Sequence, residues 1–171
     1  MLLPGSPAPD LDVTLTTGEP YRLRDELPRQ SFVVVEVYRG AHCSICRAHL
    51  GELDRRCEEF GAHGAALVAV SMNDRALALE AKQSFGLERL PVGYGLDVQA
   101  ARAFGLYLST AVKPGEPALF AEPATFVVRS DGVLYAADVR SSPHLRPQVD
   151  RLVTLVRRAA EGYPPRGGAR A

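Results

Sequence analysis

The sequence predicts an α/β fold in which a central, mainly parallel sheet carries helices on both faces. Two observations support this prediction. Short β-branched, apolar segments alternate with amphipathic helical segments along the chain, a pattern typical of parallel strands buried on both faces. Near the C-terminal end, two further strands flank a Ser-Asp-Gly turn at Ser130–Gly132, which predicts a hairpin that gives the sheet an antiparallel edge.

The first strand and helix follow from residue pattern. Phe32–Tyr38 is β-branched and almost continuously apolar, which predicts a strand buried on both faces. Ser44–Phe60 predicts a helix, because its apolar residues recur at alternating spacings of four and three and so share one face. Gly61 and Gly64 favour its end.

The middle of the chain repeats the alternation. The expected elements are a strand at Ala65–Ser71, a helix from Asn73 or Asp74 to Phe85 with Gly86 as its stop, a short strand at Val92–Gly95, and a short helix that Asp97 caps and that ends near Gly105. Leu106–Glu122 contains two prolines and predicts an irregular inserted loop. The hairpin strands are Thr125–Val128 and Val133–Val139, and a last amphipathic helix carries Val149, Leu152, Val153 and Val156.

The ends of the chain differ from the rest. Pro4–Asp10 contains three prolines and predicts neither a helix nor a central strand. We expect residues 1–160 to form a single domain. Residues 161–171 are dominated by Pro, Gly, Arg and Ala, which predicts a disordered tail.

Composition excludes several classes of function. The 171 residues include 20 basic and 20 acidic side chains, so charge gives no reason to expect binding to nucleic acid or a membrane surface. No apolar run approaches the roughly 20 residues that span a bilayer. The N-terminal segment lacks the basic and apolar regions of a secretory signal, which favours a cytoplasmic protein.

Cys43 and Cys46 form a Cys-x-x-Cys motif between the first strand and its helix. Backbone N–H groups at a helix start stabilise a thiolate, and thiols in this position have pKa values of roughly 3.5–7.5. Cys46 begins the apolar stripe, so we expect it to be the more buried thiol and Cys43 the more exposed one. Cys43 would then attack, and Cys46 would resolve the mixed disulfide.

Three polar neighbours and a competing chemistry accompany the pair. Arg39 and Arg47 flank it and could lower its pKa, and His42 could relay a proton or, when charged, stabilise an anion. A metal site is the chemical alternative, although no second ligand pair accompanies the motif.

The remaining cysteine and histidines are assigned no chemistry. Cys57 lies on the apolar stripe of the expected helix, so we expect it to be a core residue. We expect His49 and His63 to be solvated and assign His144 no role.

Four segments give the chain a family resemblance. Pro7–Asp10, Thr17–Leu23, Tyr38–Arg47 and Pro123–Val128 with its following turn resemble the redoxin, or alkyl hydroperoxide reductase/thiol-specific antioxidant, branch of the peroxiredoxin-like proteins. The resemblance covers about Pro4 to Ala160. It implies a thioredoxin-like fold, with a central mixed sheet and helices on both faces.

The motif departs from the peroxiredoxin pattern Pro-x-x-x-Thr-x-x-Cys. Aligned with it, Cys46 takes the peroxide-attacking position, Cys43 replaces Thr and Arg39 replaces Pro. The family's late Arg falls on Pro123. Two groups that orient peroxide are therefore missing from their usual places.

Aligned instead with the thioredoxin pattern Trp-Cys-Gly-Pro-Cys, Cys43 is the attacking thiol and Cys46 the resolving one. His42 replaces Trp. Pro123 matches the proline that packs beside the pair in thioredoxin-like proteins, which predicts a cis peptide bond.

The resemblance and the residues together predict a thiol-dependent oxidoreductase that cycles Cys43 and Cys46 between dithiol and disulfide. Its partners would be a thiol reductant such as thioredoxin or glutathione, or a protein disulfide. One alternative is peroxiredoxin-type reduction of hydrogen peroxide or alkyl hydroperoxides. A second is a non-catalytic metal-binding module. No glycine-rich nucleotide loop follows any expected strand, so no organic cofactor is expected.

Overall fold

The structure, a computed structural model, describes residues 2–169. Its strands are β1 (Asp12–Leu15), β2 (Pro20–Arg22), β3 (Phe32–Val37), β4 (Ala65–Val70), β5 (Val92–Tyr94), β6 (Leu108–Thr110), β7 (Leu119–Ala121), β8 (Ala124–Arg129) and β9 (Leu134–Val139). Its α-helices are α1 (Leu23–Glu26), α2 (Ser44–Arg55), α3 (Cys57–Ala62), α4 (Arg75–Phe85), α5 (Val98–Ala103) and α6 (Val149–Ala160), and the 3-10 turns are η1 (Leu27–Arg29) and η2 (Pro143–Leu145).

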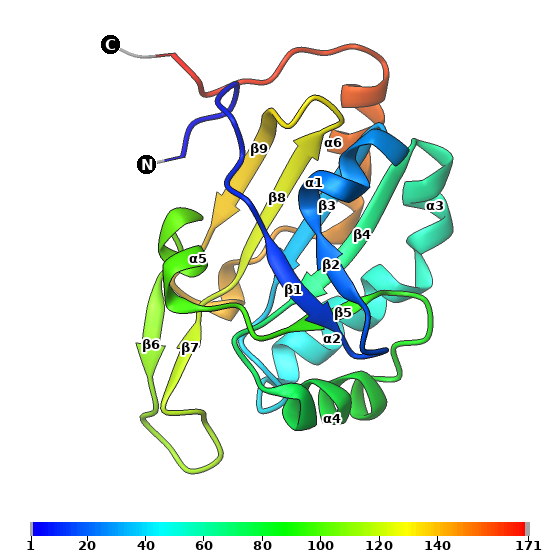
Figure 1. Ribbon diagram of the computed structural model, residues 1–171. Helices are drawn as coiled ribbons and strands as arrows, with labels where there is room; N and C mark the ends of the chain where they lie inside the picture. Colours follow the sequence, from blue (N-terminus) through cyan, green and yellow to red (C-terminus); the bar gives the residue numbers. More distant parts are fainter. Residues whose placement is uncertain (1, 170–171) are drawn as a thin grey trace.

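A seven-stranded mixed sheet runs through the centre of the molecule in the order β2-β1-β5-β4-β3-β8-β9 (Figure 1). The three central strands β3, β4 and β5 are parallel. Antiparallel pairing joins β1 to β5 on one side and β8 to β3 on the other. The predicted mixed sheet with an antiparallel hairpin at its edge is therefore confirmed, and a second antiparallel hairpin, β1–β2, lies at the opposite edge.

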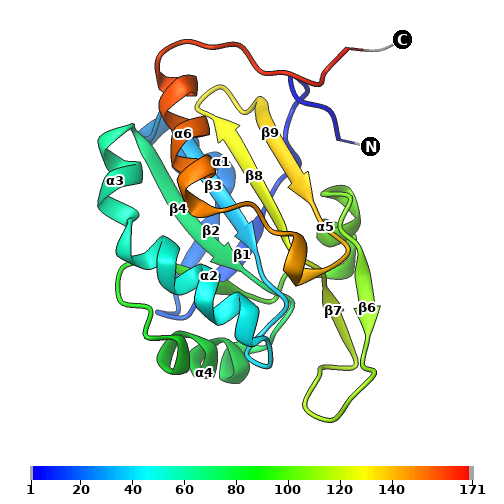
Figure 2. The same ribbon diagram turned by 180° about the vertical axis from the view of Figure 1, so that it is seen from behind.

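Helices cover both faces of this sheet, as the two opposite views show (Figures 1 and 2). One hydrophobic cluster packs α2, α3, α4 and α6 against the face that carries Phe32 and Val34. The other cluster packs α1 and α5 against the face that carries Val33 and Val35. Because the side chains of a strand alternate between faces, Glu36 points from β3 toward α2.

The expected helix boundaries hold where a cap or a glycine specifies them. Asp74 accepts a hydrogen bond from the backbone N–H of Leu77, and Asp97 caps α5 in the same way. Gly86 ends α4 in the left-handed conformation, with φ of +68°. The helix expected over Ser44–Phe60 is instead interrupted at Arg56, where α2 ends and α3 begins.

Two parts of the chain differ from the expectation. Leu106–Glu122 is not wholly irregular, because β6 and β7 pair as an antiparallel hairpin that projects from the body of the fold (Figure 1). The short strands β1 and β2 form before the first expected strand. Residues 163–169 contain no helix or strand, and the disorder expected for residues 161–171 stays a prediction, with 170 and 171 outside the described residues.

Candidate active site

The two thiols of the Cys-x-x-Cys motif lie where β3 leads into α2. Cys43 is the N-cap of α2, and its Sγ accepts the backbone N–H of Cys46 at 3.2 Å. Both thiols are free. Cys46 is fully buried, as expected, but Cys43 is only 4% exposed. The expected order of the two thiols is confirmed, but Cys43 is also buried, because this residue packs into the same hydrophobic cluster as Tyr38 and Cys46.

The thiols ionise at very different pH values. The hydrogen bond from the Cys46 thiol, followed by its backbone N–H and the charges of Arg39 and Arg146, outweighs burial and lowers the pKa of Cys43 to about 6. Burial, together with the hydrogen bond that its thiol gives to Cys43, raises the pKa of Cys46. At neutral pH the site therefore holds a thiolate at Cys43 beside a protonated thiol at Cys46.

Arg39 lies between the thiol pair and the β6–β7 hairpin. Its guanidinium pairs with Glu116 at 3.4 Å and with Glu122 at 3.3 Å. It also lies over the Phe120 ring, 4.7 Å from the centroid. Arg39 thus connects the β6–β7 hairpin to the loop after β3 through these contacts. Its charge also contributes to the low pKa of Cys43.

Two of the other predicted supporting residues, Arg47 and Pro123, are placed differently. Arg47 is exposed on α2, and the cations that lower the pKa of Cys43 are Arg39 and Arg146. Pro123 is buried at the start of β8, but no peptide bond in residues 2–169 is cis. The expected cis bond is therefore wrong: the bond between Glu122 and Pro123 is trans, and the Pro123 carbonyl accepts the N–H of Arg140 at 2.9 Å beside the β8–β9 pair.

His42 packs beside the pair without a polar partner. Its ring meets Phe120 edge-on at 5.0 Å, and both of its ring nitrogens are buried with no hydrogen bond. Burial, and then the nearby charge of Arg39, lowers the pKa of His42. The imidazole is therefore neutral at neutral pH and does not supply the positive charge considered from the sequence. It lines a cavity of about 210 Å³ together with Asn73 and Glu116.

Sequence reasoning missed Arg146, which reaches Cys46 from the segment between η2 and α6. Its Nη2 lies 3.5 Å from the Cys46 Sγ and 3.0 Å from the carbonyl oxygen of Val37, and its Nη1 pairs with Glu36 at 2.7 Å. His49 also faces Glu36, at 3.2 Å, and its side chain is only 9% exposed. The expectation that His49 is solvated is wrong. Glu36 is the one carboxylate in the apolar strand β3. A buried charge needs partners, so this residue was the signal in the sequence that buried basic side chains lie nearby.

Cys57 lies apart from this arrangement. Its Sγ donates to the carbonyl oxygen of Leu53 at 3.5 Å, and its side chain packs partly buried against the α2-side cluster, in agreement with the predicted core position. Burial, and next the charge of Asp54, raises the pKa of Cys57 to about 11. Cys57 is thus a thiol at neutral pH.

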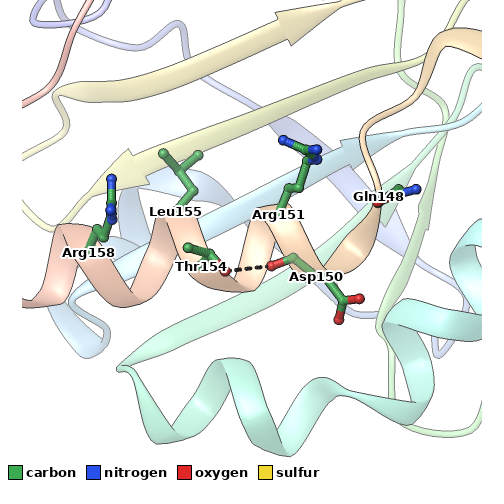
Figure 3. A pocket seen from close by; sticks show the side chains of 6 residues that line it. All are labelled: Gln148, Asp150, Arg151, Thr154, Leu155 and Arg158. Carbon is green, nitrogen blue, oxygen red and sulfur yellow. Dashed lines mark hydrogen bonds between the residues drawn. The ribbon is translucent and has the colours of Figure 1, made fainter.

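Three further observations concern the rest of the described residues. Within residues 2–169, no group of three or more His, Cys, Asp or Glu side chains is arranged to hold a metal ion. A groove of about 540 Å³ runs along α6 (Figure 3) and is lined by Gln148, Asp150, Arg151, Thr154, Leu155 and Arg158. It contains no thiol and no imidazole. None of the helices between residues 2 and 169 has the length and apolar character to cross a bilayer.

Comparison with known proteins identifies a family and similar folds. Residues 4–137 match the AhpC/TSA family. Peroxidoxin BcpB from Mycobacterium tuberculosis is similar in structure, with a TM-score of 0.75 and 19% identity over 92% of this chain and 98% of that chain. The reduced 2-Cys peroxiredoxin of Plasmodium vivax is similar with a TM-score of 0.78 and 12% identity, over 95% and 86% of the two chains.

A third similar structure is a cysteine-to-serine mutant of peroxiredoxin 6 from Arenicola marina, with a TM-score of 0.74 and 14% identity over 91% of this chain and 72% of that chain. No curated protein sequence matches. The solved structures share the thioredoxin-like fold, and the family match spans most of the chain and includes both cysteines of the motif. The protein therefore belongs to the AhpC/TSA family of thiol-dependent oxidoreductases.

Proposed function

We propose that the protein reduces peroxides with Cys43 as the attacking thiolate and Cys46 as the resolving thiol. One observation carries the proposal. The Cys43 Sγ caps α2, accepts the Cys46 N–H at 3.2 Å and has a pKa lowered to about 6, first by the hydrogen bond from the Cys46 thiol. A reversible peroxide-reducing cysteine needs a low pKa, access to the oxidant and a second thiol nearby. Cys43 has the first and the last of these, and its exposure of 4% restricts access to small oxidants.

The chemistry balances with these two sulfurs and an external thiol. The Cys43 thiolate attacks one peroxide oxygen, the O–O bond breaks, and the other oxygen leaves as an alcohol or water after taking a proton. Cys43 is then a sulfenic acid. Cys46 attacks its sulfur, a disulfide forms and water leaves. A reductant that supplies two thiols, either a dithiol such as thioredoxin or two molecules of glutathione, attacks the disulfide, resolves the resulting mixed disulfide and leaves as a disulfide, so that both protein thiols are restored.

Burial favours a small oxidant over a protein disulfide. With 4% of its surface exposed, Cys43 can meet a peroxide after little movement, whereas a protein disulfide requires a larger opening. Arg39 lies where it can supply part of the positive charge that the family's usual Arg, replaced here by Pro123, provides. These features rank peroxide reduction above the disulfide-reducing role that the motif alone suggests.

One contact favours a second candidate, in which Cys46 attacks the peroxide. Arg146 lies 3.5 Å from the Cys46 Sγ, and Cys46 occupies the position of the attacking cysteine in the peroxiredoxin pattern. Burial, however, raises the pKa of Cys46, whereas the pKa of Cys43 is lowered to about 6, first by the hydrogen bond from the Cys46 thiol. We therefore assign Cys46 the resolving role.

Oxidation by one equivalent of hydrogen peroxide tests the proposal. We expect the protein to lose two hydrogen atoms in mass, and digestion to give one disulfide-linked pair of peptides that contain Cys43 and Cys46. Cys57 should stay reduced, and should be alkylated once the protein is denatured, because its thiol is protonated in the folded protein and lies apart from the pair. Three free thiols after this treatment, or a disulfide through Cys57, would refute the assignment.

A further inference from the structure

A buried arginine, Arg146, contacts the resolving sulfur and has no part in the reaction as described so far. Its Nη2 donates to the Cys46 Sγ at 3.5 Å and to the carbonyl oxygen of Val37 at 3.0 Å. Its Nη1 pairs with Glu36 at 2.7 Å. The side chains of Arg146 and Glu36 are 5% and 1% exposed, so the guanidinium meets the sulfur out of contact with bulk water.

Three separate parts of the chain fix this contact. Arg146 lies between η2 and α6, Cys46 lies in the first turn of α2, and Glu36 lies in β3. The Glu36 oxygen that pairs with Arg146 also faces His49 at 3.2 Å, and its other oxygen accepts the Thr125 hydroxyl at 2.7 Å. A donor that the fold already holds in place needs no reorganisation when negative charge develops beside it.

The proposed cycle places negative charge on the Cys46 sulfur twice. When Cys46 attacks the sulfenic acid on Cys43, its S–H bond ionises, the S–O bond breaks, and the Cys46 proton and the leaving hydroxide form water. Later a reductant thiolate attacks the Cys43 sulfur, the more exposed of the two. The S–S bond then breaks, its electron pair leaves on Cys46, and this thiolate takes a proton from solvent.

Burial makes this charge costly, and Arg146 is placed to offset the cost. Burial, followed by the hydrogen bond to Cys43, raises the pKa of Cys46, and the charge of Arg146 is the main influence that lowers it. A hydrogen bond to an ionised group is stronger than one to a neutral group, so the Arg146 contact strengthens as charge develops on the sulfur. An interaction that is stronger in the transition state than in the ground state accelerates the step.

We propose that Arg146 is a catalytic residue that stabilises the Cys46 thiolate, both when this sulfur attacks Cys43 and when it leaves during reduction of the disulfide. The inference rests on the proposed function, from which it takes the roles of the two thiols. Peroxide attack depends on other contacts, because the Cys43 Sγ accepts the backbone N–H of Cys46 at 3.2 Å. Loss of the guanidinium should therefore slow the two disulfide steps and spare the step before them.

Rapid quenching of the Arg146→Gln variant at pH 8 separates the three steps. Sulfenic acid trapping reports peroxide attack, its decay reports disulfide formation, and a second mixing with dithiothreitol reports disulfide reduction. The pKa of Cys43 depends first on the hydrogen bond from the Cys46 thiol and less on the charge of Arg146, so peroxide attack should stay within about twofold of wild type. Both disulfide steps should slow by roughly 10- to 10²-fold, the range for losing one hydrogen bond to a charged group.

The double variant Glu36→Gln/Arg146→Gln separates this role from a loss of stability. It leaves neither member of the ion pair buried without its partner, which avoids the main cost of the single substitution. It still has no cation beside Cys46, so both disulfide steps should be as slow as in Arg146→Gln. A loosened structure would instead expose the disulfide and speed its reduction by dithiothreitol.

Arg151→Gln provides the matched control, because it removes the same charge from an exposed position on α6. It should leave all three steps unchanged. A wild-type rate for either disulfide step in the double variant, or faster reduction in either variant of Arg146, would overturn the inference and leave the peroxidase standing. A wild-type protein that forms neither sulfenic acid nor disulfide would refute the peroxidase itself.

Discussion

Cys43→Ser should reduce peroxide-dependent turnover to the level of an ordinary free thiol, whereas Cys46→Ser should consume one equivalent of peroxide and then stop. The reason is the difference between the two sulfurs. Cys43 is the thiolate at neutral pH, and an unperturbed thiol is only a few per cent ionised there. In Cys46→Ser the serine hydroxyl keeps a hydrogen-bond donor beside Cys43, so the first oxidation survives while no disulfide can follow.

Peroxide consumption in the presence of a thiol reductant measures the loss of turnover in Cys43→Ser. The single equivalent consumed by Cys46→Ser is measured without added thiol, by trapping the sulfenic acid, because an added thiol would itself reduce it. Cys57→Ala is the control and should retain turnover, because Cys57 lies apart from the pair and its pKa is raised, chiefly by burial, to about 11. The reverse pattern, in which Cys43→Ser still forms a sulfenic acid on Cys46 and Cys46→Ser forms none, would transfer the attacking role to Cys46.

Arg146→Gln should lower the free energy of unfolding by about 3–5 kcal/mol, the usual result of removing one partner of a buried ion pair. Its side chain is 5% exposed and its partner Glu36 is 1% exposed. The substitution leaves that carboxylate without its guanidinium and also removes the bond to the Val37 carbonyl. Denaturant unfolding of the reduced protein, where two-state behaviour can be checked, gives the difference directly.

The double variant Glu36→Gln/Arg146→Gln provides the control for this prediction. It removes both charges, so it should recover part of the lost stability, and a double-mutant cycle then isolates the coupling between the two side chains. If Arg146→Gln lowered the free energy of unfolding by less than about 1 kcal/mol, the value typical of an exposed pair, the Glu36–Arg146 ion pair would be hydrated rather than buried.

The parts of the fold that the sequence predicts are those with a local physical signal. β3 is predictable because all six of its residues are buried. A strand buried on both faces has an almost continuously apolar, β-branched sequence, which is visible without the structure. The helices α4 and α5 are predictable because Asp74 and Asp97 cap them. The hairpin β6–β7 has strands of three residues each, too short for periodicity to reveal, and their pairing depends on contacts such as that of Arg39 with Glu122.

The candidate site divides in the same way. The motif and its place before α2 follow from spacing, and so does the thiolate-stabilising helix start. Arg146 stands 100 residues after Cys46 in the chain, and nothing in the spacing of residues joins them. The burial of Cys43 was not predictable for a related reason, since it depends on tertiary packing within the α2-side hydrophobic cluster rather than on the helix stripe that places Cys46 inward.

The pH dependence of Cys43 alkylation tests the central claim most directly. Only the thiolate reacts, so the midpoint of the rate against pH reports the pKa even when burial makes the reaction slow. Mass spectrometry can follow Cys43 and Cys57 separately in the same sample, which makes Cys57 an internal reference. The predicted midpoint for Cys43 is about 6, and Cys57 should react appreciably only toward pH 11. A Cys43 midpoint near 8.5, the value of an unperturbed thiol, would contradict the account.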